Sequence, residues 1–544
     1  MQKSLRRDNR KTAGRKAAEM TTEIAVIGGG LGGVASALAA LKMGRRVVLS
    51  EGTDWIGGQL TAQATPPDEH RWIEQFGCTR SYRALRNEIR DWYRRNGRLS
   101  PAAGEVLHLN PGNGYVSRLC CEPRVTLAVL QNWLLPFIAS GALRVLLRHT
   151  PIAAATEGDR VQSVLLRDEE SGDKVLLVAD YFLDATELGD LLLLAGIEHI
   201  IGAESRARTG EEHAPENDQP LNQQSFSHCF AVSHHPGEDH TVEKPRDYQF
   251  WRDFQPDFWP DRLLSWTHPH PITGEASRRN LFDVAGERGG LWRYRRIRDR
   301  ANFQSSENDA DISLVNWPQI DYWLGPLCGV DEDTARRHRE GARQLSLSFL
   351  YWLQTAAPRP DGGAGFPELK PRGDVTGTRD GLAQAIYGRE SRRIQALYTV
   401  VEADVSATRP DGAAKYFDSV GIGCYRIDLH PSCGASGDGS DANSYIDIGS
   451  HPFQIPLGAL LPIRVENVLP ACKNIGTTHI TNGCYRLHPV EWNIGEAAGI
   501  LAAHCLQNDL KPAQVRDTKS LCEEFQSLLT KQGIELDWPR LESV

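Results

Sequence analysis

The stretch Ile24-Ala-Val-Ile-Gly-Gly-Gly-Leu-Gly-Gly-Val34 places five glycines directly after a run of apolar residues. Residues Thr22–Ile27, rich in β-branched side chains, predict a short buried strand. Residues Val34–Met43 are mostly small and apolar and predict a helix that ends at Gly44. A second strand is predicted at Arg46–Ser50. The stretch therefore predicts a β-α-β unit with a glycine-rich turn.

Gly28, Gly30 and Gly33 have the spacing G-x-G-x-x-G of a dinucleotide-binding turn. Gly28 would allow a sharp turn, Gly30 the approach of a pyrophosphate, and Gly33 close packing of helix on strand. The helix N-terminus offers free backbone N–H groups to the phosphates, and Leu31 is expected among the cofactor contacts. Glu51, 23 residues after Gly28, can accept hydrogen bonds from ribose hydroxyls and would repel a 2′-phosphate. We therefore predict a dinucleotide site, with a purely structural turn as the alternative.

Two stretches outside this unit favour FAD as the dinucleotide. The first, EGTDWIGGQLT at residues 51–61, begins at the acid, and its glycine pair would let the backbone pass close to a cofactor. The second, YFLDATELGD at residues 181–190, predicts a strand that runs into a tight turn. The residues expected at the cofactor here are Gly57, Gly58, Gln59, Ala185 and Thr186.

A third stretch lies near the C-terminus. NVLPACKNIG at residues 467–476 predicts a strand, and the loop that follows it is expected to continue through residues 477–488. Residues 492–503 are rich in Ala and Gly and predict a helix whose small side chains allow close backbone packing.

In this order, these stretches resemble the FAD-dependent oxidoreductases of the glutathione-reductase-like flavoprotein superfamily, in particular the branch with one FAD domain and a large inserted substrate domain. The resemblance spans roughly residues 21–510 and includes fragments at 388–393, 418–423 and 425–431. It implies FAD as the cofactor. It also implies an α/β fold, in which a discontinuous Rossmann-like FAD-binding domain carries an inserted α+β substrate domain.

The resemblance further implies a position for the predicted C-terminal helix. The helix would lie beneath the isoalloxazine, with Asn493, Ile494 and Gly495 near the pyrimidine edge. A helix N-terminus at this place stabilises the negative charge that a reduced flavin carries. The alternative is a buried packing helix.

The expected domain organisation follows from these positions. The FAD-binding domain is predicted at residues 21–205 and 455–510, with residues 62–120 as a cap segment that contains a basic helix at 81–95. The substrate domain, rich in Trp, Pro and Arg, is predicted at 206–454. Residues 1–20 are expected to form a disordered basic arm, unless the chain starts near Met20, and residues 511–544 a peripheral helix and tail.

Composition narrows the class of function. The formal net charge of −9 disfavours a general nucleic-acid binder, which normally has a basic face. No apolar stretch approaches the ~20 residues of a membrane-spanning helix. The eleven cysteines contain no C-x-x-C spacing, so no metal site is expected and a reduced, cytoplasmic location is favoured.

Five residues are candidates for catalysis. The loop before the C-terminal helix supplies His479, Arg486 and His488, and the substrate domain supplies Arg426 and His430. Histidine titrates near neutral pH and suits a base, while arginine can hold a substrate carboxylate with two hydrogen bonds. The alternatives are backbone hydrogen bonds near the cofactor for the histidines of the loop, His479 and His488, and buried structural pairs for Arg486 and Arg426.

The sequence thus predicts an FAD-dependent oxidoreductase that transfers a hydride from a small organic substrate to flavin N5, with O₂ or another acceptor taking the electrons onward. A flavin monooxygenase that uses NAD(P)H and an RNA-modifying flavoprotein are the alternatives. The chain has no second G-x-G-x-x-G β-α-β unit, which argues against a built-in NAD(P)H domain. A homodimer is one option for its assembly.

Overall fold

The predicted β-α-β unit lies in a seven-stranded sheet whose order is β3-β2-β1-β6-β5-β4, with β22 paired to β6. The computed structural model describes residues 17–270, 272–285, 289–304, 310–442 and 446–539. The parallel pairs are β1–β2, β2–β3, β1–β6 and β6–β22, and the pairs β4–β5 and β5–β6 are antiparallel. The strands are β1 (Ala18–Ile27), β2 (Val47–Glu51), β3 (Leu143–Leu147), β4 (His149–Glu157), β5 (Arg160–Asp168), β6 (Lys174–Asp184) and β22 (Val468–Pro470).

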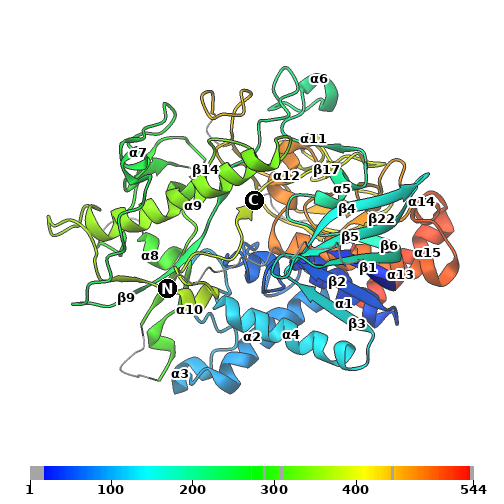
Figure 1. Cartoon of the computed structure of the whole chain (residues 1–544), viewed down its shortest axis with the longest axis horizontal. Coiled ribbons are helices and arrows are strands. Elements are labelled where there is room, and N and C mark those ends of the chain that lie inside the picture. The colour runs from blue at the N-terminus through cyan, green and yellow to red at the C-terminus, as the bar shows by residue number, and fades with distance from the viewer. Residues whose placement is uncertain (1–16, 271, 286–288, 305–309, 443–445, 540–544) are drawn as a thin grey trace, which may run out of the picture.

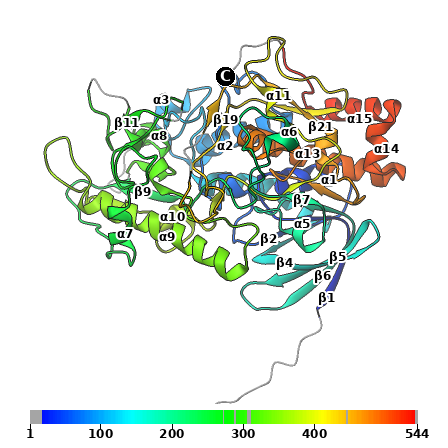
Figure 2. The ribbon, with the colours of Figure 1, turned by 90° about the horizontal axis from the view of Figure 1, so that it is seen from above.

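Alternate side chains of β1 enter two different cores. Ile24 and Val26 pack in a cluster with α1 (Leu31–Lys42) and α13 (His488–Asn508), whereas Ala25 and Ile27 pack in a cluster on the other face. Successive strand residues point to opposite faces, so a continuous apolar run fits a sheet that is buried on both sides. Figure 2 shows the sheet at the lower right, with α1 and α13 beside it.

β1 begins at Ala18, four residues before the predicted start at Thr22. Its first residues pair with the start of β6, which satisfies backbone groups that would otherwise lack hydrogen-bond partners. Met20 packs against the cluster on the other face of the sheet, which contains Ala25 and Ile27. Residues 18–20, expected in the basic arm, therefore belong to the sheet. Residues 1–16 of that arm lie outside the described residues.

The helices α1 and α13 touch through their backbones. A Cβ added to Gly495 of α13 would lie 2.0 Å from the Gly32 carbonyl oxygen of α1, and one added to Gly499 would lie 2.3 Å from the Ser36 oxygen. Real Cβ atoms do not approach an oxygen this closely, so both positions require glycine. The Ala- and Gly-rich composition of α13 therefore has a packing reason.

Two predictions for the C-terminal segment need correction. Residues His479–Tyr485, expected in a loop, form the helix α12, because the Thr478 hydroxyl accepts from the Thr481 N–H and caps its start. The following helix α13 begins at His488, four residues before the predicted start at Trp492. Asn493 therefore lies in its second turn instead of at its N-terminus.

The middle of the chain forms a second body around the long helix α9 (Glu332–Thr355), at the left of Figure 1. Its core is rich in aromatic side chains, among them Trp251, Trp317, Trp323 and Phe349. The strands form the sheets β12-β13-β9-β15, β14-β8-β16 and β10-β11. The bounds are β8 (Phe226–Ser227), β9 (Phe230–His234), α7 (Tyr248–Asp253), β10 (Thr267–Pro269), β11 (Ala276–Arg278), α8 (Leu291–Tyr294), β12 (Arg296–Arg298), β13 (Ile312–Val315), β14 (Asp321–Tyr322), β15 (Leu369–Pro371), α10 (Gly373–Thr376) and β16 (Tyr387–Gly388).

The chain returns to the first core well before residue 454. Val400, Val420 and Phe453 belong to the same cluster as α1 and α13. The last buried residue in the aromatic core of the second body is Leu382. This returning segment is largely irregular. Its elements are β17 (Arg393–Ile394), which pairs with β7 (His199–Ile200), α11 (Glu402–Val405), β18 (Ser419–Gly423), β19 (Ile427–Asp428), β20 (Asp447–Ile448) and β21 (Phe453–Pro456).

The remaining helices cover the first core. The predicted helix at 81–95 is confirmed as α2 (Arg80–Asn96), and the helix α4 (Pro123–Ala139) comes later in the same part of the chain. The C-terminal segment is not peripheral as expected: Val515, Phe525 and Leu529 are fully buried in the first core. The bounds of the others are α3 (Pro101–Gly104), α5 (Asp190–Leu194), α6 (Arg206–Thr209), α14 (Pro512–Asp517) and α15 (Lys519–Gln532). Among the helices of the described residues, none is long and apolar enough to cross a membrane.

Candidate functional site

The glycine turn lies against the carboxyl ends of three strands. Gly28 has a φ of +99°, and a Cβ there would meet the Ala185 carbonyl oxygen at 2.3 Å, so the turn needs glycine for both conformation and space. The Gly29 N–H donates to Glu51 Oε2 at 2.9 Å, and the Thr53 N–H and hydroxyl each donate to Oε1 at 2.8 Å. Burial raises the pKa of Glu51. The structure thus brings Gly28, Glu51 and Ala185 together, as the sequence predicts.

A second buried carboxylate, Glu491 of α13, lies at the N-terminus of α1. Its Oε1 accepts from the Gly32 N–H at 3.2 Å, and its Oε2 accepts from the Gln59 amide. Burial raises the pKa of Glu491, although Lys473 opposes this rise. Lys473 itself forms an ion pair with Glu187 at 2.8 Å. Gln59 was predicted at the cofactor, whereas Glu491 was not.

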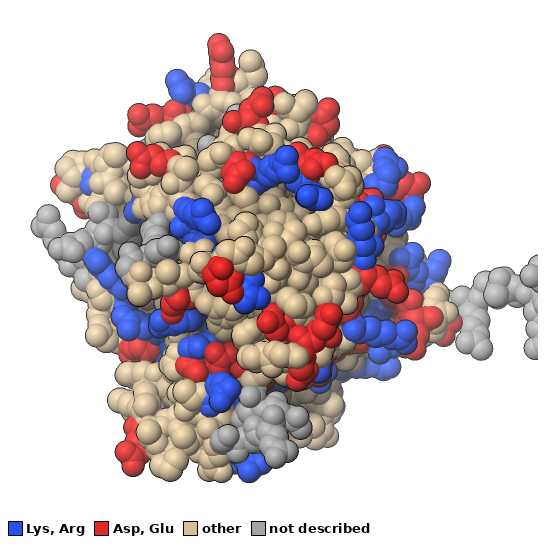
Figure 3. Space-filling model, turned by 90° about the vertical axis from the view of Figure 1, so that its left-hand side faces the viewer, with Lys and Arg blue, Asp and Glu red and all other residues tan. Residues whose placement is uncertain are grey.

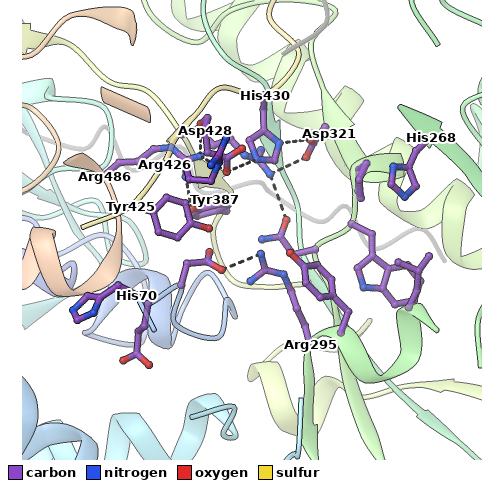
Figure 4. Close-up of a pocket in the computed structure, with 18 of the residues that line it drawn as sticks. His70, His268, Arg295, Asp321, Tyr387, Tyr425, Arg426, Asp428, His430 and Arg486 are labelled. Atoms are coloured by element: carbon purple, nitrogen blue, oxygen red, sulfur yellow. Dashed lines mark hydrogen bonds and ion pairs between the residues drawn. The ribbon is translucent and has the colours of Figure 1, made fainter. Parts of the chain in front are cut away.

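A cavity of about 540 Å³ opens between the two bodies of the protein. Arg426, His430 and Arg486, three of the five predicted catalytic residues, line it (Figure 4). Residues 68–71 of the predicted cap segment line it too. Six arginines and four carboxylates face the cavity, which gives it an excess of positive charge. The cavity therefore suits an anionic small molecule.

His430 lies between two carboxylates of this cavity. Its Nδ1 is 2.6 Å from Asp321 Oδ2, and its Nε2 is 3.4 Å from Asp428 Oδ2. Asp321 is also held by Arg389 at 2.8 Å. Burial alone would raise the pKa of Asp321, but Arg389 and His430 outweigh burial and hold that pKa below its usual range. His430 therefore lies between two acids, Asp321 and Asp428.

Arg486 links the cavity to α12 and α13. One of its Nη atoms donates to the Tyr387 hydroxyl at 2.8 Å, and the other lies 3.5 Å from Asp428. Its side chain is 3% exposed. Burial raises the pKa of the Tyr387 phenol, which therefore stays protonated and can donate a hydrogen bond.

Arg295, at the start of β12, forms a further charged corner. It lies 3.4 Å from Asp68 and 5.1 Å above the ring of Tyr294. Tyr425 lines the same cavity, and burial raises the pKa of its phenol well above the usual value. In Figure 4, Arg295 and Arg486 enter the cavity from different sides.

Comparison with known proteins identifies the family. A sequence model of the family described as FAD dependent oxidoreductase matches residues 23–529. This chain belongs to the FAD dependent oxidoreductase family. It is an oxidoreductase with FAD as its cofactor, and its α/β fold combines a Rossmann-like FAD-binding domain with an inserted domain. The match extends to residue 529, beyond the predicted limit at residue 510.

Solved structures were compared as well. A geranylgeranyl bacteriochlorophyll reductase-like protein from Thermoplasma acidophilum is 10% identical, with a TM-score of 0.32, and the match covers 95% of this chain and 85% of that one. A mutant of E. coli quinol fumarate reductase FrdA is 10% identical, with a TM-score of 0.33, over 95% and 74%. L-proline dehydrogenase from P. horikoshii is 13% identical, with a TM-score of 0.18, over 36% and 27%. A search of the curated proteins finds no match.

The residues around the glycine turn of this FAD-dependent oxidoreductase fit a dinucleotide. The turn leads into a helix of 12 residues, long enough to direct backbone N–H groups at a pyrophosphate. Two side-chain oxygens beside the turn, Ser50 Oγ and Asp184 Oδ2, are buried without a partner among the described residues. Burial raises the pKa of Asp184 to about 7. The predicted contacts Gly30, Leu31, Gly33, Gly57, Gly58 and Thr186 lie in or beside this turn, and their role at FAD stays a prediction.

The three predicted flavin contacts of α13 have packing partners in this structure. The Asn493 amide accepts from the Ile422 N–H and donates to the Val420 oxygen, each at 3.2 Å. Gly495 meets Gly32 of α1, and Ile494 is fully buried in the first core. These contacts support the packing alternative for the side chains, and a flavin contact at these positions stays a prediction.

His479 and His488 lie outside the 540 Å³ cavity. His479 Nδ1 is 2.9 Å from Glu390, and the ring lines a second cavity of about 370 Å³ that shares His430 with the first. His488 Nδ1 accepts from the Asp68 N–H at 3.0 Å. Burial lowers the pKa of His488 to about 4, so the ring is neutral. Of the predicted histidines, only His430 lies at the large cavity together with Arg426 and Arg486.

One group in the described residues has the spacing of metal ligands. Glu212, His213 and Glu402 offer ligand atoms within 4.8 Å of one another. His213 Nδ1 lies 2.6 Å from Glu402 Oε1, and this contact accounts for the group without a metal ion.

Several site residues escaped the sequence analysis. Asp68, Arg295, Asp321 and Tyr387 line the cavity, yet they come from four separate segments without a shared motif. Tyr425 was part of a fragment that carries the family resemblance, and that fragment could have indicated it. Glu491 stands in the first turn of α13, where an acid beside a predicted cofactor helix was a usable signal.

Proposed function

We propose that this enzyme oxidises a small anionic organic substrate by removing a hydride and a proton from it. The observation that carries the proposal is the cationic 540 Å³ cavity, which contains a histidine between two carboxylates. A cavity of this volume is typical of small-molecule sites. When bound, FAD supplies the two-electron acceptor for such an oxidation.

The cofactor would be held by the residues around the glycine turn. The N-terminus of α1 suits the pyrophosphate, and the Glu51 carboxylate suits the ribose hydroxyls. The cavity lies beside α12 and α13, through Arg486 at their junction. Substrate and cofactor sites would therefore meet at this junction.

His430 is the group proposed to take the proton. Asp321 accepts a hydrogen bond from Nδ1, which fixes the orientation of the ring and leaves Nε2 as the basic nitrogen. Asp428, 3.4 Å from Nε2, would stabilise the imidazolium once the proton has arrived. Arg486 and the Tyr387 hydroxyl, 2.8 Å apart, would hold an oxygen of the substrate.

Surface charge supports a small molecule over RNA. On the face in Figure 3, Lys and Arg are interleaved with Asp and Glu, and no single basic surface stands out. A nucleic-acid site normally gathers positive charge on one face. In the cavity, by contrast, six arginines face four carboxylates.

The test is an anaerobic screen of the holoenzyme. Hydroxy acids, amino acids, alcohols and amines are added one at a time, and the visible absorbance of the oxidised flavin is followed. Loss of that absorbance with one anionic substrate and no added NADPH is the expected result. Loss with NADPH alone would contradict the proposal and favour a monooxygenase.

A further inference from the structure

Four arginines that line the large cavity share an unusual feature. The Nε–H groups of Arg279, Arg295, Arg389 and Arg486 are buried and have no hydrogen-bond partner among the described residues. Arg295, Arg389 and Arg486 are at most 7% exposed. A buried donor without an acceptor is destabilising, and native proteins rarely leave one so.

Four arginines buried elsewhere in this protein do not share the feature. Arg86 Nε donates to Glu69 at 2.8 Å, and Arg90 Nε to the Leu109 oxygen at 3.0 Å. Arg296 Nε donates to the Gly112 oxygen at 2.8 Å, and Arg393 Nε to the Thr477 oxygen at 3.1 Å. Arg45, away from the cavity, is the one further arginine with a buried, unpartnered Nε–H among the described residues, so four of these five arginines line the cavity.

Arg486 and Arg295 each have an aspartate beside them, but their hydrogen-bonding capacity is not exhausted. Arg486 and Arg295 face Asp428 and Asp68 through Nη atoms, at 3.5 and 3.4 Å. Each therefore retains an Nε–H, the donor that forms one arm of a two-bond fork to a carboxylate. Neither a hydroxyl nor an amine offers two acceptor oxygens to such a fork.

Two of these unpaired Nε–H donors, those of Arg486 and Arg295, come from different segments of the chain and lie on different sides of the cavity. Arg486 stands between α12 and α13, while Arg295 lies between α8 and β12. They enter the cavity from different sides in Figure 4, and each has an aspartate and a tyrosine of its own. A substrate with a single small carboxylate group would pair with one of these two arginines and leave the Nε–H of the other unpaired.

We infer that the substrate is a small organic acid with two carboxylates, one bound by Arg486 and the other by Arg295. The inference rests on the proposed function, because it names the class of molecule that is oxidised in this cavity. The bond that breaks would lie between the two anchored ends, within reach of His430.

The experiment measures equilibrium binding to the oxidised holoenzyme under anaerobic conditions, through the change in the flavin spectrum. The ligands are malonate, succinate, glutarate and adipate, with butyrate and dimethyl succinate as one-charge and neutral controls and inorganic phosphate as a different anion. One dicarboxylate should bind about tenfold or more tightly than butyrate. Equal binding of succinate, its homologues and butyrate, or tighter binding of phosphate, would overturn the inference.

Two variants test which arginine binds each carboxylate of the ligand. Arg295→Lys and Arg486→Lys each keep the positive charge but remove the Nε–H fork. Each should weaken the binding of the most tightly bound dicarboxylate about tenfold, while the affinity for butyrate should stay within about threefold of the original. The matched control is Arg293→Lys, because Arg293 is an exposed neighbour that pairs with Asp283. This variant should change neither the affinity for the dicarboxylate nor the affinity for butyrate. Unchanged dicarboxylate binding in both cavity variants contradicts the inference.

The two proposals fail in different ways. If a neutral compound or a monocarboxylate reduces the flavin and dicarboxylates do not bind, the dicarboxylate inference is wrong and the oxidation stands. If dicarboxylates bind as expected but no compound of the screen reduces the flavin, the inference on binding stands and the proposed oxidation is wrong.

Discussion

At the scale of single residues, the surroundings of a histidine decide its chemistry. His430, His479 and His488 all satisfy the sequence argument that histidine suits a base. Their environments differ: His430 lies at the large cavity between Asp321 and Asp428, His479 is held by Glu390, and His488 is fully buried and neutral. Of the three, only His430 lies at the cavity that also holds Arg426 and Arg486.

His430→Asn therefore tests the proton acceptor. The variant should retain FAD, because His430 lies far along the chain from the glycine turn and is not part of it, and flavin reduction by the substrate should slow by about 10²–10⁴-fold. Single-turnover reduction in an anaerobic stopped-flow instrument gives this rate. His479→Asn is the contrast and should stay within about tenfold of the original rate. If flavin reduction is slow in His479→Asn and fast in His430→Asn, the proton acceptor is His479 instead of His430.

At the scale of elements, the contact between α1 and α13 sets the position of the cofactor turn. The turn ends where α1 begins, and α1 is fixed by the backbone contact at Gly32 and Gly495. Glu491 of α13 adds a hydrogen bond to the Gly32 N–H. The family resemblance places Gly495 near the flavin, which stays a prediction, and the structure gives Gly495 a backbone contact with α1.

Gly495→Ala measures the strength of this contact. In a helix interior, alanine is favoured over glycine by about 1 kcal/mol, so a propensity effect would stabilise the protein. The clash at 2.0 Å with the Gly32 oxygen should dominate, since backbone cannot yield, and should lower the free energy of unfolding by about 1–3 kcal/mol. Urea unfolding of the holoenzyme measures the difference.

The control for this variant is Gly104→Ala in α3. An added Cβ there meets no atom within 4 Å, so stability should stay unchanged or rise slightly. A Gly495→Ala variant as stable as Gly104→Ala would mean that the helices are not in contact as described.

At the scale of the whole molecule, a buried ionic network joins segments that are distant in the sequence. Glu204, Glu390 and Arg393 are at most 6% exposed, and they connect the end of β7 to β17 and, through His479, to α12. Burial alone would lower the pKa of His479, but Glu390 outweighs burial and raises it. The same contact, together with Arg393, lowers the pKa of Glu390 to about 2.

This raised pKa predicts a pH-dependent contribution to stability. Because the folded state holds the His479 proton more tightly than the unfolded chain does, the contribution is complete below the unfolded pKa of about 6.5 and is lost as the pH rises through the higher folded value. His479→Gln should thus lower the free energy of unfolding by about 2 kcal/mol at pH 5.5. The loss should shrink above neutral pH.

Thermal and urea unfolding of both proteins between pH 5.5 and 9 give the comparison. A stability difference that stays constant over this range would show that the proton of His479 does not contribute. The FAD content of each sample is the control, because FAD bound to the folded state adds stability of its own.

The sequence by itself determined the cofactor and the class of fold, because both depend on short-range patterns. The turn at Gly28 needs a positive φ, the strand buried on both faces needs a continuous apolar run, and the acid Glu51 ends the second strand, all within one β-α-β unit. Such features are local, so residue type and spacing are sufficient to predict them.

Tertiary structure alone decided which polar residues face one another. The cavity draws on residues from Asp68 to Arg486, and its partners, such as His430 with Asp321 and Arg295 with Asp68, are more than 100 residues apart. No local pattern encodes these pairs, because they depend on how the second body and the returning segment pack on the first. The same packing buries Glu491 beside Gly32.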